Sequence, residues 1–165
     1  DRLASVLAMA PNERTVLVGF GGIPLTSIPL EQMDQLDHYR FLFDGPVPPS
    51  YSRIHSTMML PFSFKTLLAS VDVIMTKPGY GTIVEAVALQ QPVVYVRRYN
   101  FADEPLLVDY LHRYGRGVEL SIDDFAQGRW EPALQQALAS PVPSLPPPPS
   151  GAVEAADVIV RYCQV

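Results

Sequence analysis

Short apolar runs recur along this chain, and segments with helical spacing lie between them. Strands are expected at residues 15–20, 40–43, 56–60, 71–75, 92–96 and 118–120, and helices at about residues 2–10, 30–37, 63–70, 82–89, 104–114 and 131–139. Continuous apolar strands that alternate with helices are typical of a parallel sheet covered on both faces. The sequence therefore predicts an α/β fold with three layers and a mostly parallel sheet of about six strands.

Two glycines follow one of these strands directly. Gly79 and Gly81 flank Tyr80 after the run at 71–75, and glycine allows a sharp turn and a close approach of the backbone to another molecule. In a parallel sheet, strand carboxyl ends and helix amino ends share one edge, where phosphate and sugar ligands bind. We therefore interpret this turn as part of a ligand cleft.

A second glycine pair, Gly21 and Gly22, follows the predicted strand at 15–20. A lone pair of this kind is also typical of a tight turn, which is the alternative interpretation. Together with the turn at Gly79, however, it predicts two phosphate-facing loops. We expect both loops on the same edge of the sheet.

Polar residues beside the first turn have two interpretations each. Thr82 and Glu85 have the spacing of a capping box, in which both side chains satisfy backbone N–H groups at the start of a helix. Alternatively, the Glu85 carboxylate accepts hydrogen bonds from ribose hydroxyls. Lys77 could meet a diphosphate as a point charge, or it could be a solvated lysine at a strand end.

At these residues the chain resembles a known family. The string KPGYGTIVEAVALQQPVVYV is similar to the donor-binding motif in the C-terminal half of GT-B glycosyltransferases, especially the bacterial enzymes that transfer N-acetylglucosamine onto the peptidoglycan lipid precursor. The continuation RRYNFADEPLLVDYLHRYGRGVEL resembles the glycosyltransferase-like domain fused to plant arabinose kinases. The resemblance implies a Rossmann-like domain that forms half of a GT-B architecture.

The resemblance also implies roles for individual residues. Glu85 would hold the ribose, Asp103 and Glu104 would touch the donor sugar, and Leu60 and Pro61 would contact the nucleotide base through their backbone. The full set of expected donor-binding residues is Gly21, Gly22, Leu60, Pro61, Lys77, Gly79, Tyr80, Gly81, Thr82, Glu85, Asp103 and Glu104.

The implied function is that of the nucleotide-sugar-binding half of a glycosyltransferase, which transfers a hexosyl group from a UDP-sugar donor to an unknown acceptor. Its partner would be an N-terminal acceptor domain or a separate acceptor subunit, and we expect no activity from this half alone. The alternative is a non-catalytic domain that binds a sugar nucleotide or carbohydrate beside another enzyme.

Length and composition fit one domain over residues 1–165. The formal net charge is −5, and no basic run accompanies the 12 lysines and arginines, so nucleic acid is not an expected partner. No apolar stretch reaches the roughly 18 residues of a membrane span, and a cytoplasmic protein is expected. The single cysteine gives no metal-ligand spacing, and the three histidines match no nucleophile motif. We therefore assign no metal, no cofactor and no catalytic residue.

The proline-rich segment 141–149 cannot enter a helix or a central strand, so we expect an extended strap. A helix is expected after it at residues 151–163. Its apolar positions need a surface to pack on, and we expect it to fold back on the same domain, with Cys163 buried.

Overall fold

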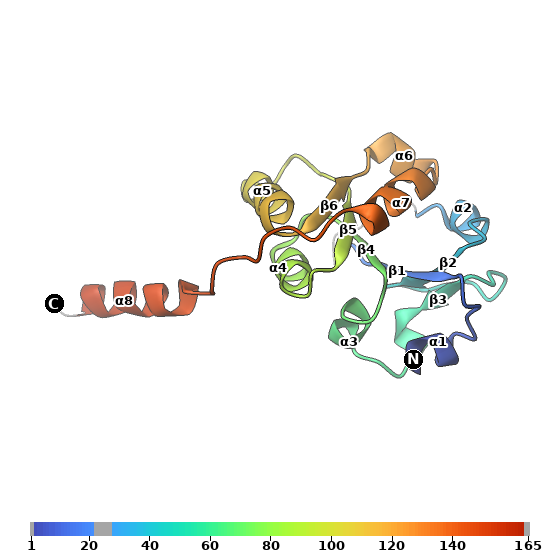
Figure 1. Cartoon of the computed structure of the whole chain (residues 1–165), viewed down its shortest axis with the longest axis horizontal. Helices are drawn as coiled ribbons and strands as arrows, with labels where there is room; N and C mark the ends of the chain where they lie inside the picture. Colours follow the sequence, from blue (N-terminus) through green and yellow to red (C-terminus); the bar gives the residue numbers. More distant parts are fainter. Residues whose placement is uncertain (1, 22–27, 164–165) are drawn as a thin grey trace.

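Six parallel strands form the sheet of this protein in a computed structural model, which describes residues 2–21 and 28–163. The strand order is β3-β2-β1-β4-β5-β6, and every neighbouring pair is parallel (Figure 1). The strands are β1 Arg14–Val18, β2 Tyr39–Phe43, β3 Ile54–Ser56, β4 Val73–Thr76, β5 Pro92–Tyr95 and β6 Arg116–Glu119. The predicted fold class is therefore confirmed.

The direction in which the chain adds strands reverses at β1. The first three strands run outward from β1 to β3, and the chain then returns to place β4 on the free side of β1, so that Val16 pairs with both Phe41 and Val73. The crossovers on either side of β1 depart in opposite directions, which opens a crevice at the carboxyl ends of β1 and β4.

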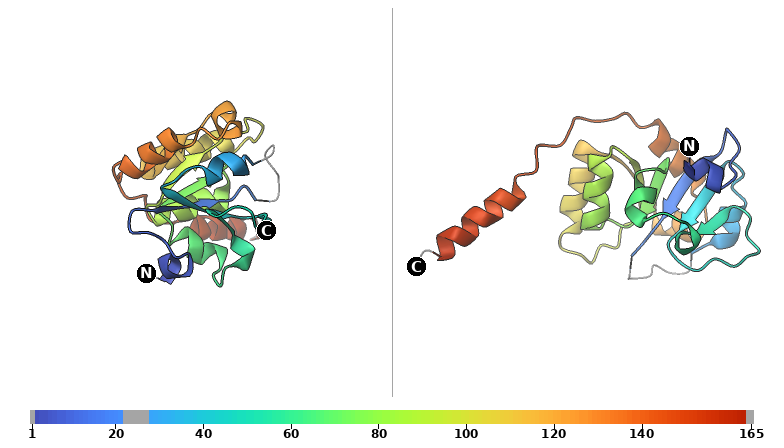
Figure 2. Two further views of the ribbon diagram at one scale, coloured as in Figure 1. Left: turned by 90° about the vertical axis from the view of Figure 1, so that its right-hand side faces the viewer. Right: turned by 90° about the horizontal axis from the view of Figure 1, so that it is seen from below.

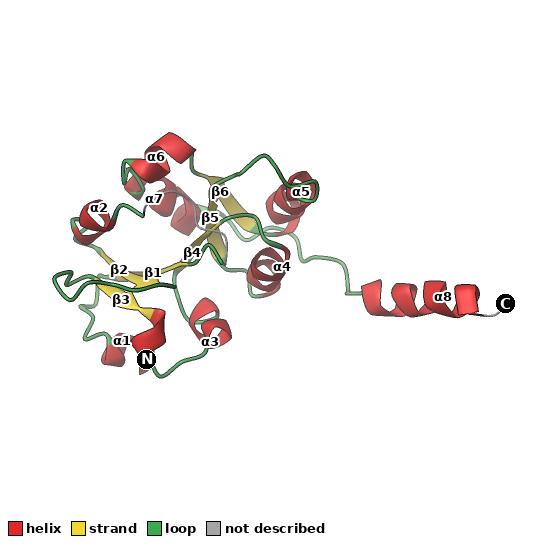
Figure 3. Ribbon diagram, turned by 180° about the vertical axis from the view of Figure 1, so that it is seen from behind, coloured by secondary structure: helices red, strands yellow, loops and turns green. Residues whose placement is uncertain are grey.

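Helices cover both faces of the sheet. The helices of the described residues are α1 Arg2–Val6, α2 Leu30–Asp34, α3 Phe64–Leu68, α4 Tyr80–Ala88, α5 Glu104–Tyr114, α6 Ile122–Ala126, α7 Glu131–Ala139 and α8 Gly151–Cys163, with a 3-10 turn, η1, at Thr57–Met59, and all but α8 pack against the sheet. Two of the views show α2, α6 and α7 on one side of the sheet and α1, α3, α4 and α5 on the other (Figures 2 and 3). The predicted three-layer arrangement is thus present.

The two cores follow from alternation along the strands. Val16 and Val18 of β1 face the layer of α2, α6 and α7, whereas Leu17 faces the other layer. The first core is centred on Trp130, which is fully buried, stacks on Phe125 and donates its indole N–H to the Phe125 carbonyl at 2.9 Å. This bond satisfies the one polar group of a large side chain inside an apolar layer.

Several predicted bounds differ from the structure, and one helix of the structure was not predicted. The helix expected at 2–10, for example, ends at Val6. The strand expected at 56–60 is Ile54–Ser56 followed by η1, because Ser56 pairs with Phe43, the last residue of β2, and no partner strand continues beyond it. Helix α4 begins two residues earlier than expected. Helix α6 was not expected; Ser121 caps it by accepting a hydrogen bond from the Asp124 N–H at 3.0 Å.

The expectation that the last helix folds back is wrong. Helix α8 has the expected bounds, but none of its residues is buried, and it lies apart from the α/β body (Figure 1). Cys163 is exposed rather than buried. The prolines between residues 141 and 149 favour an extended backbone, which carries the chain away from α7 instead of turning it back.

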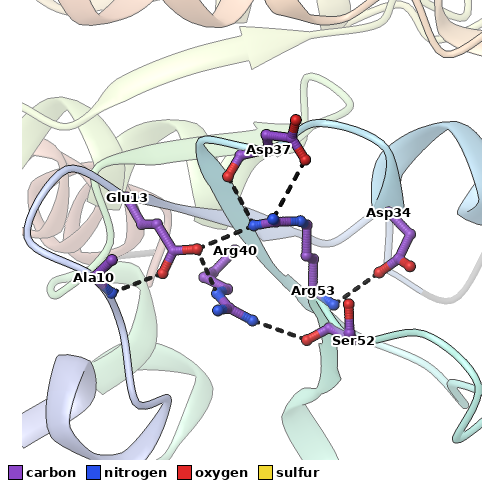
Figure 4. A network of polar contacts seen from close by, with 7 residues as sticks. All are labelled: Ala10, Glu13, Asp34, Asp37, Arg40, Ser52 and Arg53. Carbon is purple, nitrogen blue, oxygen red and sulfur yellow. Dashed lines mark hydrogen bonds and ion pairs between the residues drawn. The ribbon is translucent and has the colours of Figure 1, made fainter.

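A charged network closes the amino edge of the sheet (Figure 4). The buried Glu13 carboxylate accepts the Ala10 N–H at 2.8 Å and pairs with Arg40 and Arg53, each at 3.0 Å, and Arg53 also pairs with Asp37. The Ala10 hydrogen bond, opposed by burial and assisted by the two arginines, holds the pKa of Glu13 below its ordinary value. This network ties together the starts of β1, β2 and β3, at the edge opposite the crevice.

Candidate functional site

A cavity of about 190 Å³ lies where β1 and β4 end. Its lining residues are Gly19, Phe20, Gly21, Asp44, Phe64, Thr76, Lys77, Gly79 and Thr82. Hydrogen bonds that continue the sheet fix two of them, since the Gly19 N–H donates to the Met75 carbonyl at 3.0 Å and the Asp44 N–H to the Val18 carbonyl at 2.9 Å. The structure therefore gathers four predicted site residues, Gly21, Lys77, Gly79 and Thr82, on one edge.

Among the described glycines that line the cavity, Gly21 has a backbone conformation that favours glycine. Its φ of 62° lies in the left-handed region that side chains disfavour, and a Cβ at this position would stand 3.5 Å from the Lys77 Nζ. The glycine therefore leaves open the space beside the ammonium group. Its neighbour Gly22 lies outside the described residues.

Lys77 supplies positive charge to the cavity. Its side chain is half-buried, and within residues 2–21 and 28–163 no carboxylate forms an ion pair with it. Burial lowers the pKa of Lys77, and the positive charge of Arg98 lowers it further. A cation that is partly desolvated and repelled by another cation favours an anion as its neighbour.

The amino end of α4 faces the same edge without a side-chain cap. The N-cap residue is Gly79, whose backbone is extended, with a φ of −122° that any residue can adopt. Gly81 lies inside the first turn, and a Cβ there would meet nothing within 4 Å. Tyr80 between them is 71% exposed. The first N–H groups of this nine-residue helix are thus positioned to bind a negatively charged group.

The capping-box interpretation of Thr82 and Glu85 is wrong. Because α4 starts at Tyr80, Thr82 is its third residue and Glu85 its sixth, in the second turn, and no cap hydrogen bond from a side chain is present. The two residues are one helical turn apart and share a face of α4. Thr82 lines the cavity, and the half-buried Glu85 lies one turn further along.

The acidic pair after β5 is split by the structure. Asp103 is exposed, as predicted, but Glu104 is only 1% exposed. The Glu104 carboxylate accepts the Arg97 Nε–H at 2.9 Å, the Arg98 N–H at 3.0 Å and the Tyr99 N–H at 3.3 Å. Burial raises the pKa of Glu104, but these hydrogen bonds outweigh burial and hold the pKa below its ordinary value. The predicted exposure of Glu104 is therefore wrong, because the carboxylate binds its own loop.

Leu60 and Pro61 do not line this cavity. Leu60 is partly buried against the core on the α3 and α4 side, and Pro61 is exposed. Core packing therefore accounts for the partial burial of Leu60, and the predicted base contact of both residues stays a prediction.

Sequence reasoning missed several residues of this edge, of which Asp44, Phe64 and Arg98 matter most. Asp44 directly follows β2 just as Gly21 closely follows β1, so its position at a strand end could have identified it. Phe64 contributes a ring, which a Cβ at Gly19 would approach to 3.2 Å. Nothing local in the sequence marks Arg98.

No helix among the described residues is both long enough and apolar enough to pass through a membrane. Within the same residues, no group of three or more histidine, cysteine, aspartate or glutamate side chains could hold a metal ion.

Comparisons with known proteins identify a relative in sequence. No protein-family model matches the chain. The chain is 29% identical over 163 residues to an L-arabinokinase of Arabidopsis thaliana, and the match covers 96% of this chain but only 15% of that protein.

Several solved structures with a similar fold are glycosyltransferases. The glycotransferase of kitacinnamycin matches with a TM-score of 0.61 and 19% identity, covering 78% of this chain and 36% of that one. Glycosyltransferase VinC, in complex with DTDP, matches with a TM-score of 0.54 and 18% identity, covering 96% and 40%. Os79 from O. sativa, in complex with UDP and deoxynivalenol-3-glucoside, matches with a TM-score of 0.51 and 18% identity, covering 82% and 38%. The chain therefore has the Rossmann-like fold of one half of a GT-B glycosyltransferase.

Proposed function

We propose that this chain is the donor-binding half of a glycosyltransferase and that it binds a UDP-sugar at the carboxyl ends of β1 and β4. The observation that carries the proposal is the cavity that brings together Gly21, Lys77 and the uncapped start of α4. These are the groups that a diphosphate requires, namely a close backbone approach, a positive charge and outward N–H groups. Two of the similar structures were solved with the nucleotides DTDP and UDP.

The chemistry of this half is the stabilisation of a leaving group. When a glycosyl group leaves its nucleotide, negative charge develops on the diphosphate oxygen that held it. The dipole of α4 and the Lys77 ammonium would stabilise that charge, since fixed dipoles and cations act strongly where water is partly excluded. Glu85 would hold the ribose hydroxyls from the second turn of α4. A second half, carrying the acceptor, would complete the cleft.

A titration with UDP, dTDP, GDP and ADP tests the proposal, with Lys77→Met as the informative variant. Loss of one charged contact to a phosphate should weaken UDP binding about ten- to a hundred-fold. Lys65→Met is the matched control, because Lys65 and Lys77 are the two lysines of the chain and Lys65 is exposed on α3 outside the cavity. Absence of nucleotide binding in the parent chain, or equal losses in both variants, would refute the proposal.

A non-catalytic sugar-nucleotide-binding domain is the second candidate. The similarity to a segment of an L-arabinokinase favours this candidate. The matched segment makes up only 15% of that protein, whose name describes a kinase and not a glycosyltransferase. The two candidates differ in turnover. Release of free UDP from a UDP-sugar by the complete protein supports a transferase, whereas binding of the UDP-sugar without its consumption supports the second candidate.

A further inference from the structure

The segment that follows β5 brings a second cation, Arg98, to the edge of the sheet that carries Lys77, where its positive charge lowers the pKa of Lys77. In the sheet, Thr76 of β4 pairs with Tyr95 of β5, and the ladder continues with the Val96 N–H donating to the Thr76 carbonyl at 3.0 Å. Lys77 directly follows β4, and Arg97 and Arg98 are the first two basic residues after β5. They therefore emerge from adjacent strands at the same edge.

The guanidinium of Arg98 differs from the other half-buried arginines of the molecule. It lies 4.1 Å from the centre of the Phe101 ring. Its Nε and Nη1 atoms are buried, and among the described residues neither has a hydrogen-bond partner. Arg97, in contrast, is paired with Glu104, and Arg40 is paired with Glu13. Buried guanidinium nitrogens without partners are rare, because an unmet donor loses its hydration without compensation.

Glu104 sets the position of Arg98 without neutralising it. The carboxylate accepts the backbone N–H groups of Arg98 and Tyr99 and forms its ion pair with Arg97. Arg97 thus balances the charge of Glu104, and no carboxylate within residues 2–21 and 28–163 forms an ion pair with Arg98. Asp44 lies on the β2 side of the cavity, where its carboxylate accepts the Thr57 hydroxyl at 3.2 Å.

We propose that Arg98 and Lys77 together bind one oxyanion of the donor, and that Glu104 is a positioning residue that acts by holding the backbone of Arg98. The proposal rests on the proposed donor-binding function and adds to it a residue pair and the charge of the group that the pair recognises. Two oxyanions share the required chemistry, namely the diphosphate and a carboxylate on the sugar. Two cations at one edge of the sheet match either of them.

The test is a set of titrations of the 165-residue chain with pyrophosphate, UDP, UDP-glucose and UDP-glucuronate, using Arg98→Met. Methionine keeps an apolar contact with Phe101 and removes the charge. We expect binding of the recognised oxyanion to weaken about ten-fold or more. The control is Arg161→Met on the exposed helix α8, which should change nothing.

The probes separate the two sources of the oxyanion. Weaker binding of pyrophosphate and of all three nucleotides identifies the diphosphate. A loss confined to UDP-glucuronate identifies a sugar carboxylate. Unchanged binding of every probe would overturn the proposal while leaving the donor-binding function intact. Pyrophosphate binding that depends on Arg98, without any nucleotide binding, would support the pair and refute the donor-binding function, and a parent chain that binds no probe would refute both.

Glu104 is tested by a double-mutant cycle. Glu104→Gln should weaken binding in the parent chain but add no further loss in the Arg98→Met background, because a positioning residue acts only through the group that it positions. A purely structural role would give the same loss in both backgrounds. Thermal melts of all four proteins show whether each remains folded. Equal losses in both backgrounds would overturn the positioning role.

Discussion

At the scale of single residues, the glycines near the cavity have different physical roles. Gly21 has a positive φ and is needed for the conformation of its turn, whereas Gly79 has an extended backbone. Gly81 is a helical residue with open space where its side chain would be. The pattern of glycines that suggests a sharp turn in the sequence therefore has that meaning only at Gly21. At Gly81, what remains is the room that the missing side chain leaves at the start of α4.

Replacing Gly81 with alanine separates stability from binding. Alanine in a helix, where no atom stands in its way, should raise the free energy of unfolding by about 0.4–1 kcal/mol. If a ligand approaches the start of α4, the added methyl group should weaken UDP binding at the same time. Chemical denaturation and a UDP titration measure the two effects. Gly151→Ala, at the start of α8, is the control that should leave binding unchanged, and unchanged binding in Gly81→Ala as well would contradict close ligand approach at α4.

Replacing Glu85 with glutamine tests the ribose contact. Since Glu85 lies in the second turn of α4 and does not cap it, the amide should change the melting temperature little. Loss of a charged acceptor to ribose hydroxyls should cost about 1.5–3 kcal/mol, which is ten- to a hundred-fold in UDP affinity. A titration and a melt of each protein give the comparison. Equal affinities would exclude the ribose role.

At the scale of elements, contact with the sheet distinguishes the helices that position loops at the cavity edge from the helix that does not. Helices α4 and α5 bury one face against the sheet and fix the loops that precede them, and Glu104, the first residue of α5, anchors the β5–α5 loop. Helix α8 has an apolar composition but contacts no surface of the body. Amphipathicity alone therefore did not determine where a helix packs.

Removal of α8 should leave the α/β body intact. Because no residue of Gly151–Cys163 is buried, its deletion should change the free energy of unfolding by less than about 0.5 kcal/mol, or the melting temperature by less than roughly 2 °C. A thermal melt of the chain ending at Ser150 measures this. A drop of several degrees would show that α8 packs on the body in solution.

At the scale of the whole molecule, buried carboxylates stabilise both edges of the sheet. Glu13 ties the amino ends of β1, β2 and β3, and Glu104 holds the loop at the carboxyl end of β5. Both have a pKa in the folded state below the ordinary value. Each is surrounded by donors from parts of the chain that folding brings together.

Stability should therefore fall in acid. A carboxyl group whose pKa is lower in the folded state contributes stability that is fully present above its unfolded pKa, about 4.3, and is lost as the pH falls through its folded pKa. We expect a nearly constant contribution from Glu13 and Glu104 between pH 7 and about 5, and a decline below about pH 4.3. Melts across this range measure it. Glu13→Gln should lower the melting temperature at pH 7 and flatten the decline, and an unchanged slope would contradict the role of Glu13.

The sequence by itself determined the three-layer α/β fold and the edge of the sheet at which the cavity lies. Apolar runs, helical spacing and glycines at strand ends are local patterns, and the parallel connections then place all strand carboxyl ends together. Helices α5, α7 and α8 have their expected bounds for the same reason.

Only the tertiary structure decided the surroundings of individual side chains. It buried Glu104 in its own loop, brought Arg98 to the same edge of the sheet as Lys77, added Asp44 to the cavity and left α8 without a buried residue. Burial and charge at these residues depend on groups that are distant in the chain. A local pattern can place a residue at an edge, but the neighbours that fix its charge and exposure are supplied by packing.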